Sequence, residues 1–180
     1  IPNGVNTDDF HIKSSLKLLD INGIPNVPII LFMGRLNVIK GPDLLLKAFI
    51  ASRHNFPEYH LVFAGPDEDM LAEMLLIVEQ AGVSDFVHFL GFIYGDEKSA
   101  VYHSASLLVV PSRQEAMSLV ALEAGICRVP VLITNECGFS AISSLDPRLV
   151  VPANTQGLQD GLISLLSDSN SLKGVGSLWF

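Results

Sequence analysis

Two cations lie five positions apart in a short segment that glycines bound. The segment Gly34–Gly41 carries Arg35 and Lys40, follows a continuous apolar run, and precedes a helical pattern. A guanidinium offers a planar fork of donors and an ammonium a mobile point charge, and a helix N-terminus also attracts anions. Together these groups suit a diphosphate. The same residues are also compatible with two solvent-exposed surface cations that bind no ligand.

Two carboxylates stand eight positions apart later in the chain. Glu115 falls between a strand pattern and a helical pattern, whereas Glu123 lies within a helical pattern that is otherwise apolar. A carboxylate in apolar surroundings must meet hydroxyls or cations, and vicinal sugar hydroxyls are natural partners. The small residues Ala116 and Ser118 leave backbone N–H groups accessible at the helix start. Each glutamate taken singly also fits a surface or salt-bridged acid.

Apolar runs alternate with helical patterns along the chain, and this alternation must position the charged residues. The sequence predicts an α/β fold with a Rossmann-like, doubly wound parallel sheet, in which ligands bind at the carboxyl ends of the strands. Strands are expected over 28–35, 59–65, 87–92, 106–112, 129–134 and 148–152, and helices over 42–56, 67–81, 96–104, 118–127 and 156–166.

Composition excludes several classes of function. The net charge is -8, with 49% hydrophobic and 17% charged residues. This balance excludes a disordered chain and a broad nucleic-acid surface. Neither Walker A nor G-x-G-x-x-G is present, which disfavours a P-loop ATPase and a standard dinucleotide site. Cys127 and Cys137 are expected to be buried, unpaired thiols.

The remaining titratable residues give weaker signals. Five scattered histidines show no metal-ligand spacing along the chain and are expected to be structural or exposed. The acidic run at 67–69 follows a strand pattern and could look catalytic, but an acidic first turn of a helix accounts for it better.

Several segments together resemble family 4 glycosyltransferases, specifically the C-terminal, nucleotide-sugar-binding half of their GT-B fold. The strongest element is Glu-x7-Glu, here Glu115 to Glu123, and the second is Gly-Arg-Leu-x4-Gly with Lys40 inside it. The segments that carry the resemblance are IPNGVNTDDF (1–10), LFMGRLNVIKG (31–41), LVFAGP (61–66), VHFLGFI (87–93) and PSRQEAMSLVALEAGICRVPV (111–131).

The resemblance implies a retaining transfer of a sugar from a nucleoside-diphosphate sugar to an acceptor hydroxyl. Arg35 and Lys40 would neutralise the diphosphate, and Glu115 would sit by the sugar hydroxyls, as the catalytic set. Donor binding would further involve Gly34, Ile93 near the base, Glu123 at the ribose, and the backbone of Ala116, Met117, Ser118 and Leu119. No metal or other cofactor is expected, because the cations and N–H donors neutralise the leaving group.

The resemblance also implies an organisation and a set of partners. Residues 1–26 would be an interdomain linker and 27–180 the donor-binding domain, shortened at both ends and inactive alone. The partners would be a nucleotide sugar and a missing N-terminal acceptor domain, with no nucleic acid. The full-length protein would be cytoplasmic or peripheral at the inner face of the membrane, with an acceptor that could be membrane-associated.

Three departures from the family pattern leave other functions open. The usual Gly-Phe-Gly reads Ala116-Met117-Ser118, Arg128 replaces a glycine, and the usual acid near Ala141 is missing. A non-catalytic nucleotide-binding or interaction domain on the same fold is therefore the alternative. A nucleotide-sugar epimerase on a GT-B-like fold is a third hypothesis, which the Glu-x7-Glu spacing disfavours.

Overall fold

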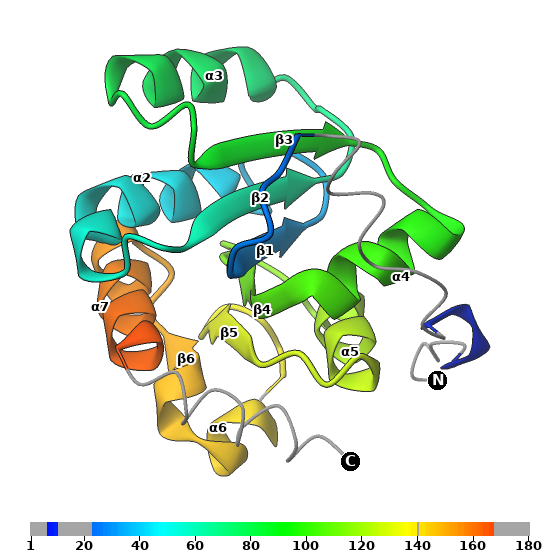
Figure 1. The fold of residues 1–180 in the computed structure, drawn as a ribbon. Coiled ribbons are helices and arrows are strands. Elements are labelled where there is room, and N and C mark those ends of the chain that lie inside the picture. The colour runs from blue at the N-terminus through cyan, green and yellow to red at the C-terminus, as the bar shows by residue number, and fades with distance from the viewer. Residues whose placement is uncertain (1–6, 11–22, 140, 168–180) are drawn as a thin grey trace.

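A six-stranded sheet, in which every neighbouring pair of strands is parallel, forms the centre of the computed structural model (Figure 1). The structure describes residues 7–10, 23–139 and 141–167. The strand order β3-β2-β1-β4-β5-β6 is that of a doubly wound sheet, which confirms the predicted fold class. The strands are β1 (Ile29–Met33), β2 (His60–Ala64), β3 (Val87–Gly91), β4 (Ala105–Val110), β5 (Val131–Thr134) and β6 (Val150–Val151).

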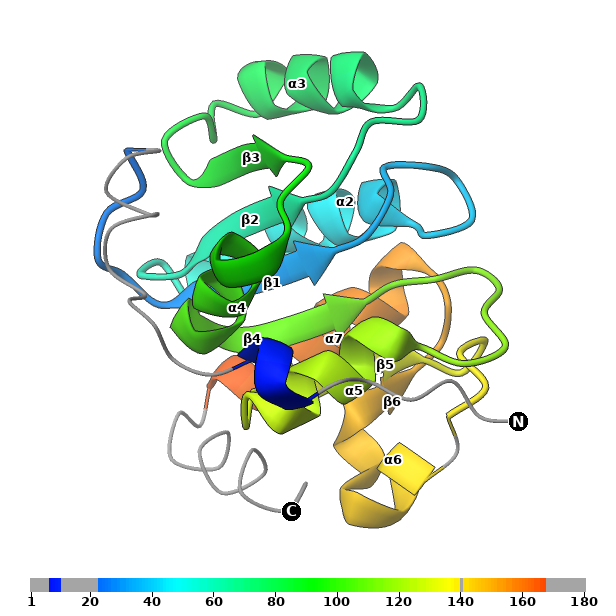
Figure 2. The ribbon, with the colours of Figure 1, turned by 90° about the vertical axis from the view of Figure 1, so that its right-hand side faces the viewer.

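Helices cover both faces of the sheet, and the burial of the strands follows from this. Helices α4 and α5 lie on one face, and α2 and α7 on the other (Figure 2). All residues of β1 and β2 are buried, as expected for continuous apolar runs in a sheet covered on both sides. The helices are α2 (Pro42–Ser52), α3 (Leu71–Gln80), α4 (Gly95–Ser104), α5 (Leu119–Ile126), α6 (Ala141–Leu145) and α7 (Thr155–Leu166).

The predicted strands and the longer helices are all present, with boundaries that differ for local reasons. Helix α3 begins at Leu71 rather than near Asp67, because the Asp67 carboxylate accepts hydrogen bonds from the backbone N–H groups of Met70 and Leu71 at 2.9 and 3.0 Å. Asp67 therefore caps the helix from outside, and the acidic run does not form its first turn. The five-residue helix α6 was not predicted.

Part of the expected linker packs against the domain. Most of residues 1–26 lies outside the described residues, but Thr7–Phe10 forms a 3-10 turn beside α4. Phe10 is buried there, with its ring edge-to-face with that of Tyr102 at a centroid distance of 5.8 Å. The Phe10 carbonyl also contacts His103 Nε2 at 2.9 Å. This turn therefore anchors the segment beside α4. Both cysteines are buried free thiols, as predicted.

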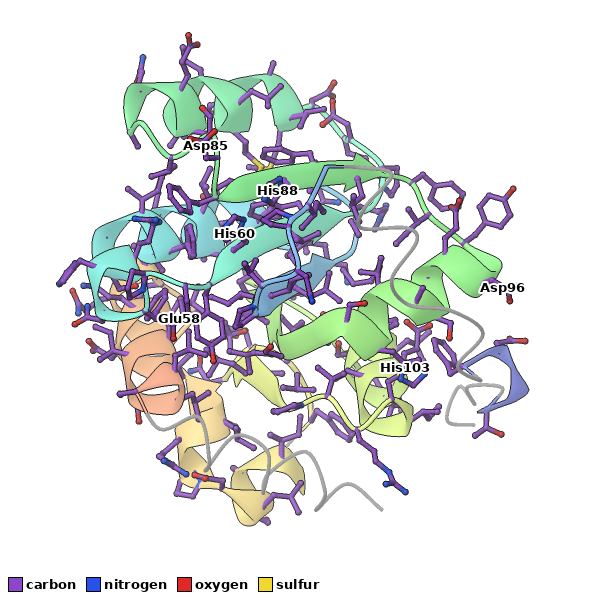
Figure 3. The ribbon with its side chains drawn as sticks, in the orientation of Figure 1. Glu58, His60, Asp85, His88, Asp96 and His103 are labelled. Carbon is purple, nitrogen blue, oxygen red and sulfur yellow. The ribbon has the colours of Figure 1, made fainter. Side chains whose placement is uncertain are left out.

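Two histidines from neighbouring strands form a pair at the amino end of the sheet. His60 Nδ1 lies 2.9 Å from His88 Nε2, and the rings stack at 5.2 Å between centroids (Figure 3). Burial lowers the pKa of both side chains; nearby Arg53 lowers that of His60 further, His60 lowers that of His88, and Asp85 raises both. The pair is accordingly a structural contact between neutral imidazoles.

Acidification should destabilise the fold through this pair. Both folded pKa values lie below the ordinary histidine value of 6.5, so the unfolded chain binds more protons beneath that pH and stability falls as the pH is lowered. We predict that the free energy of unfolding, measured in urea, decreases between about pH 7 and about pH 5, and that His88→Phe flattens this decrease. The control His54→Gln removes an exposed imidazole and should keep the wild-type slope. An unchanged slope in His88→Phe would contradict the assignment.

Arg128 occupies a backbone conformation that favours glycine. Its φ is 59°, and it follows α5 as the left-handed residue of a Schellman motif. The Arg128 N–H donates to the Gly125 carbonyl at 2.8 Å, and the Val129 N–H donates to the Ala124 carbonyl at 2.9 Å. An arginine at this position therefore leaves strain in the turn that leads from α5 into β5.

Replacing Arg128 by glycine should stabilise the chain. A left-handed backbone costs a residue with a Cβ about 1–2 kcal/mol, and glycine avoids this cost. The gain is reduced because glycine also makes the unfolded chain more flexible. We expect Arg128→Gly to raise the free energy of unfolding by about 1 kcal/mol. Arg128→Ala removes the same charge but keeps the Cβ, so it should give no such gain. Equal effects of the two variants would show that the arginine side chain, not the backbone, matters.

Candidate functional site

Glycines let three loops meet at the carboxyl edge of the sheet. A Cβ on Gly41 would lie 2.2 Å from the Pro111 carbonyl oxygen, and one on Gly65 would lie 1.9 Å from the Gly34 carbonyl oxygen. No side chain fits at these distances, so the loops after β1, β2 and β4 approach each other backbone to backbone. This approach brings the segment with the two predicted cations against the segment that carries Glu115.

Lys40 and Glu115 form an ion pair across these loops. Lys40 Nζ lies 3.0 Å from Glu115 Oε1, and the two side chains are 26% and 11% exposed. Ser112 Oγ donates to Glu115 Oε2 at 2.9 Å, so both carboxylate oxygens are engaged. The backbone N–H of Lys40 donates to Asn37 Oδ1 at 2.9 Å, which fixes the start of the lysine. Hydrogen bonds thus hold the carboxylate of this partly buried pair at both oxygens and the lysine at its backbone.

The loop after β5 holds the Glu115 segment in place. The Glu115 N–H donates to the Glu136 carbonyl at 3.0 Å, and the Gly138 N–H donates to the Glu115 carbonyl at 2.8 Å. A Cβ on Gly138 would lie 2.3 Å from the Ala116 carbonyl oxygen. The backbone around the altered Ala116-Met117-Ser118 sequence is therefore fixed from outside. Ser118 caps α5, since its Oγ accepts a hydrogen bond from the Ala121 N–H at 3.4 Å.

The second glutamate has two partners on α4. Lys98 Nζ lies 2.6 Å from Glu123 Oε1, and Tyr102 OH donates to Glu123 Oε2 at 2.6 Å. Burial, reinforced by the charge of Glu123, raises the pKa of Tyr102 well above its usual value, so the phenol stays protonated and donates. Burial and Glu123 also raise the pKa of the Cys127 thiol to about 12, which makes it an inert core group.

Arg35 and Lys40 have different partners, although the sequence places the two residues close together. Arg35 Nη1 lies 2.9 Å from Glu68 Oε1, and its side chain is 56% exposed. Asn37 Nδ2 donates to the other Glu68 oxygen at 2.6 Å, and this bond, followed by that from Arg35, lowers the pKa of Glu68. The two cations are thus bonded to two different acids.

A cavity of about 190 Å³ opens beside the Lys40–Glu115 pair. It is smaller than typical ligand pockets, so it holds only part of a nucleotide-sized molecule and the rest must lie on the open edge. Of the predicted site residues, Gly34, Lys40, Glu115, Met117 and Leu119 line it. The other lining residues are Phe32, Met33, Val109, Val110, Pro111, Ser112 and Val120.

Five predicted site residues lie outside this lining. Glu123 points to α4, and Ser118 and Ile93 are buried. Arg35 and Ala116 are exposed. Ile93 stands between two exposed aromatic residues, Phe92 and Tyr94, whose rings stack at 5.9 Å. Within the described residues no cluster of three or more His, Cys, Asp or Glu side chains is arranged to hold a metal ion.

The comparisons with known proteins identify the family. The family description "Glycosyl transferases group 1" matches residues 17–176. The chain belongs to the group 1 glycosyl transferases. An uncharacterized glycosyltransferase of Methanocaldococcus jannaschii is 34% identical over 177 residues, which are 93% of this chain and 44% of that protein. A D-inositol 3-phosphate glycosyltransferase of Rhodococcus opacus is 32% identical over 161 residues, 85% of this chain and 36% of that protein. This group 1 domain thus spans less than half the length of these relatives.

A solved structure supports the same assignment for the fold. The C-terminal domain of a group 1 glycosyl transferase from Francisella tularensis superimposes with a TM-score of 0.83 at 26% identity, covering 96% of this chain and 93% of that domain. The group 1 glycosyl transferase domain described here is therefore similar in extent to that C-terminal domain. No helix in the described ranges is long and apolar enough to cross a membrane.

Sequence reasoning missed four side chains at this edge of the group 1 domain. They are the partners of the predicted charged residues: Lys98, Tyr102, Ser112 and Glu68. Ser112 stands three positions before Glu115 in the same loop. A hydrogen bond from the serine hydroxyl to the glutamate could have been proposed from that spacing. Lys98 and Tyr102 lie on another helix, so only the packing of α4 against α5 places them.

The close approach at Gly41 can be tested against a matched glycine. Gly41 and Gly82 have φ values of 69° and 65°, but a Cβ on Gly82 would meet nothing within 4 Å. Both alanine variants bear the same left-handed strain, so their difference isolates the clash with Pro111. We expect Gly41→Ala to lower the free energy of unfolding by about 1–3 kcal/mol more than Gly82→Ala. Equal losses would contradict the interlocked loops.

Proposed function

We propose that this chain is the C-terminal, donor-binding half of a retaining GT-B glycosyltransferase of family 4, which moves a hexose from a nucleoside-diphosphate sugar to an acceptor hydroxyl. The observation that carries the proposal is the Lys40–Glu115 pair beside the cavity at the carboxyl edge. The pair places a cation that can bind phosphate next to a carboxylate that can accept hydrogen bonds from sugar hydroxyls. Family membership supports the transferase chemistry.

The proposed roles follow the geometry of the edge. Lys40 binds the diphosphate, together with the N–H groups at the start of α5, and Glu115 binds the sugar hydroxyls. Charge builds on the diphosphate as the glycosidic bond breaks, and a fixed ammonium stabilises that charge most in the transition state. In this proposal no metal ion is required. Arg35 can bind the diphosphate only after its ion pair with Glu68 breaks. Breaking this pair costs little, because both side chains are exposed.

The ribose is proposed to lie at Glu123. Lys98 and Tyr102 each occupy one of its oxygens, and each carboxylate oxygen keeps a second acceptor site for a ribose hydroxyl. The base then lies toward the β3 end near Ile93. Because this chain spans less than half of its relatives, we place acceptor recognition in the remainder of the full-length protein and expect no turnover by the chain alone.

Calorimetric titration of the chain with UDP, GDP and ADP tests the proposal, with Glu123→Gln as the decisive variant. We expect one nucleoside diphosphate to bind, and Glu123→Gln to weaken it by about 1.5–3 kcal/mol while inorganic pyrophosphate binds unchanged. Pyrophosphate has no ribose, so it reports only on the diphosphate site.

The control Glu79→Gln removes the same charge from the exposed face of α3 and should change neither affinity. Absence of binding by all three nucleotides would contradict the proposed function. Equal weakening of nucleotide and pyrophosphate in Glu123→Gln would contradict the ribose role.

A further inference from the structure

The two groups assigned to the diphosphate and to the sugar neutralise each other in this structure. Lys40 Nζ lies 3.0 Å from Glu115 Oε1, and both side chains are largely withdrawn from water. An anion that binds to the Lys40 ammonium therefore also comes near the Glu115 carboxylate. The attraction of the ammonium is offset unless something compensates Glu115.

The two partners differ in how firmly they are held. Glu115 is fixed through Ser112, which is 1% exposed and whose carbonyl accepts a hydrogen bond from Thr134 Oγ1 at 2.5 Å. The lysine is anchored at its backbone, but its ammonium ends a flexible four-carbon stem. On anion binding it is thus the ammonium that turns, while the carboxylate stays and loses its cation.

We propose that the Lys40–Glu115 pair biases the site toward the sugar-bearing donor and against the free nucleoside diphosphate, an inference that rests on the proposed function. A donor brings sugar hydroxyls that donate to Glu115 when Lys40 turns to the phosphates. A free nucleoside diphosphate brings no sugar hydroxyls to Glu115. Its terminal phosphate also carries additional negative charge at neutral pH, because its last proton is lost at about pH 6. Glu115 repels that charge and so favours release of the product.

The neighbouring Arg35–Glu68 pair lacks the features that produce this bias. Its side chains are 56% and 40% exposed, and neither residue lines the cavity. Water and salt screen such a pair, so breaking it changes little. Of the two acids that pair with Arg35 and Lys40, it is therefore Glu115 that produces the preference for the donor over the free diphosphate.

The test compares product and donor affinities in Glu115→Gln, by calorimetry with the pairs UDP and UDP-glucose, GDP and GDP-mannose, and ADP and ADP-glucose. We expect the variant to bind the free diphosphate about fivefold more tightly than the wild type, and to shift the ratio of the two affinities toward the free diphosphate. Asp160→Asn makes the same charge change on an exposed residue of α7 and should leave both affinities unchanged. Weaker or unchanged binding of the free diphosphate by Glu115→Gln would overturn the inference.

Inorganic pyrophosphate separates this inference from the proposed function. If the wild type binds pyrophosphate but none of the nucleotides, the proposed function fails, and the charge pair is then judged on pyrophosphate alone. Tighter pyrophosphate binding by Glu115→Gln supports neutralisation of Lys40 by Glu115. Unchanged or weaker binding overturns it.

Discussion

The approach of the β1 and β4 loops is the constraint on which the rest of the site depends. These strands are neighbours at the point where the order of the sheet reverses, so their carboxyl ends open onto one crevice. Gly41 allows backbone contact with Pro111, and Arg113 closes the junction through a bidentate ion pair with Asp43 at 2.8 and 2.7 Å. Only with the loops in this register does the Lys40 ammonium reach the Glu115 carboxylate.

Charge in the site is balanced locally rather than over the whole molecule. The chain carries a net charge of -8, yet each glutamate of the Glu-x7-Glu element meets a lysine. Lys40 comes from the segment before α2, and Lys98 comes from α4. An acidic protein can in this way bind one small anion, because salt screens the distant charges, whereas nearby cations and helix N–H groups act at contact distance.

The sheet and most helices could be predicted from the sequence, because buried parallel strands appear as continuous apolar runs and helical patterns alternate with them. It also brought Lys40 and Glu115 to one edge, since the residues after parallel strands share that edge. The ion-pair partner of Arg35 could not be predicted, because only the fold determines which acids lie near the side chain of a loop residue. The same holds for Lys98 at Glu123, 25 positions away, and for the His60–His88 contact, 28 positions apart. Helix α6 was missed because its five residues, AISSL, are too few for a helical period to be recognised.

The central claim is that a nucleoside-diphosphate sugar binds at the carboxyl edge between the β1 and β4 loops. An amide chemical-shift titration of the chain, with the donor that calorimetry selects, tests it most directly. The account predicts that the largest shifts gather in residues 34–41 and 112–123, with smaller ones near Ile93 and none at the amino end around His60. Shifts centred at the amino end, or spread without relation to these loops, would contradict it.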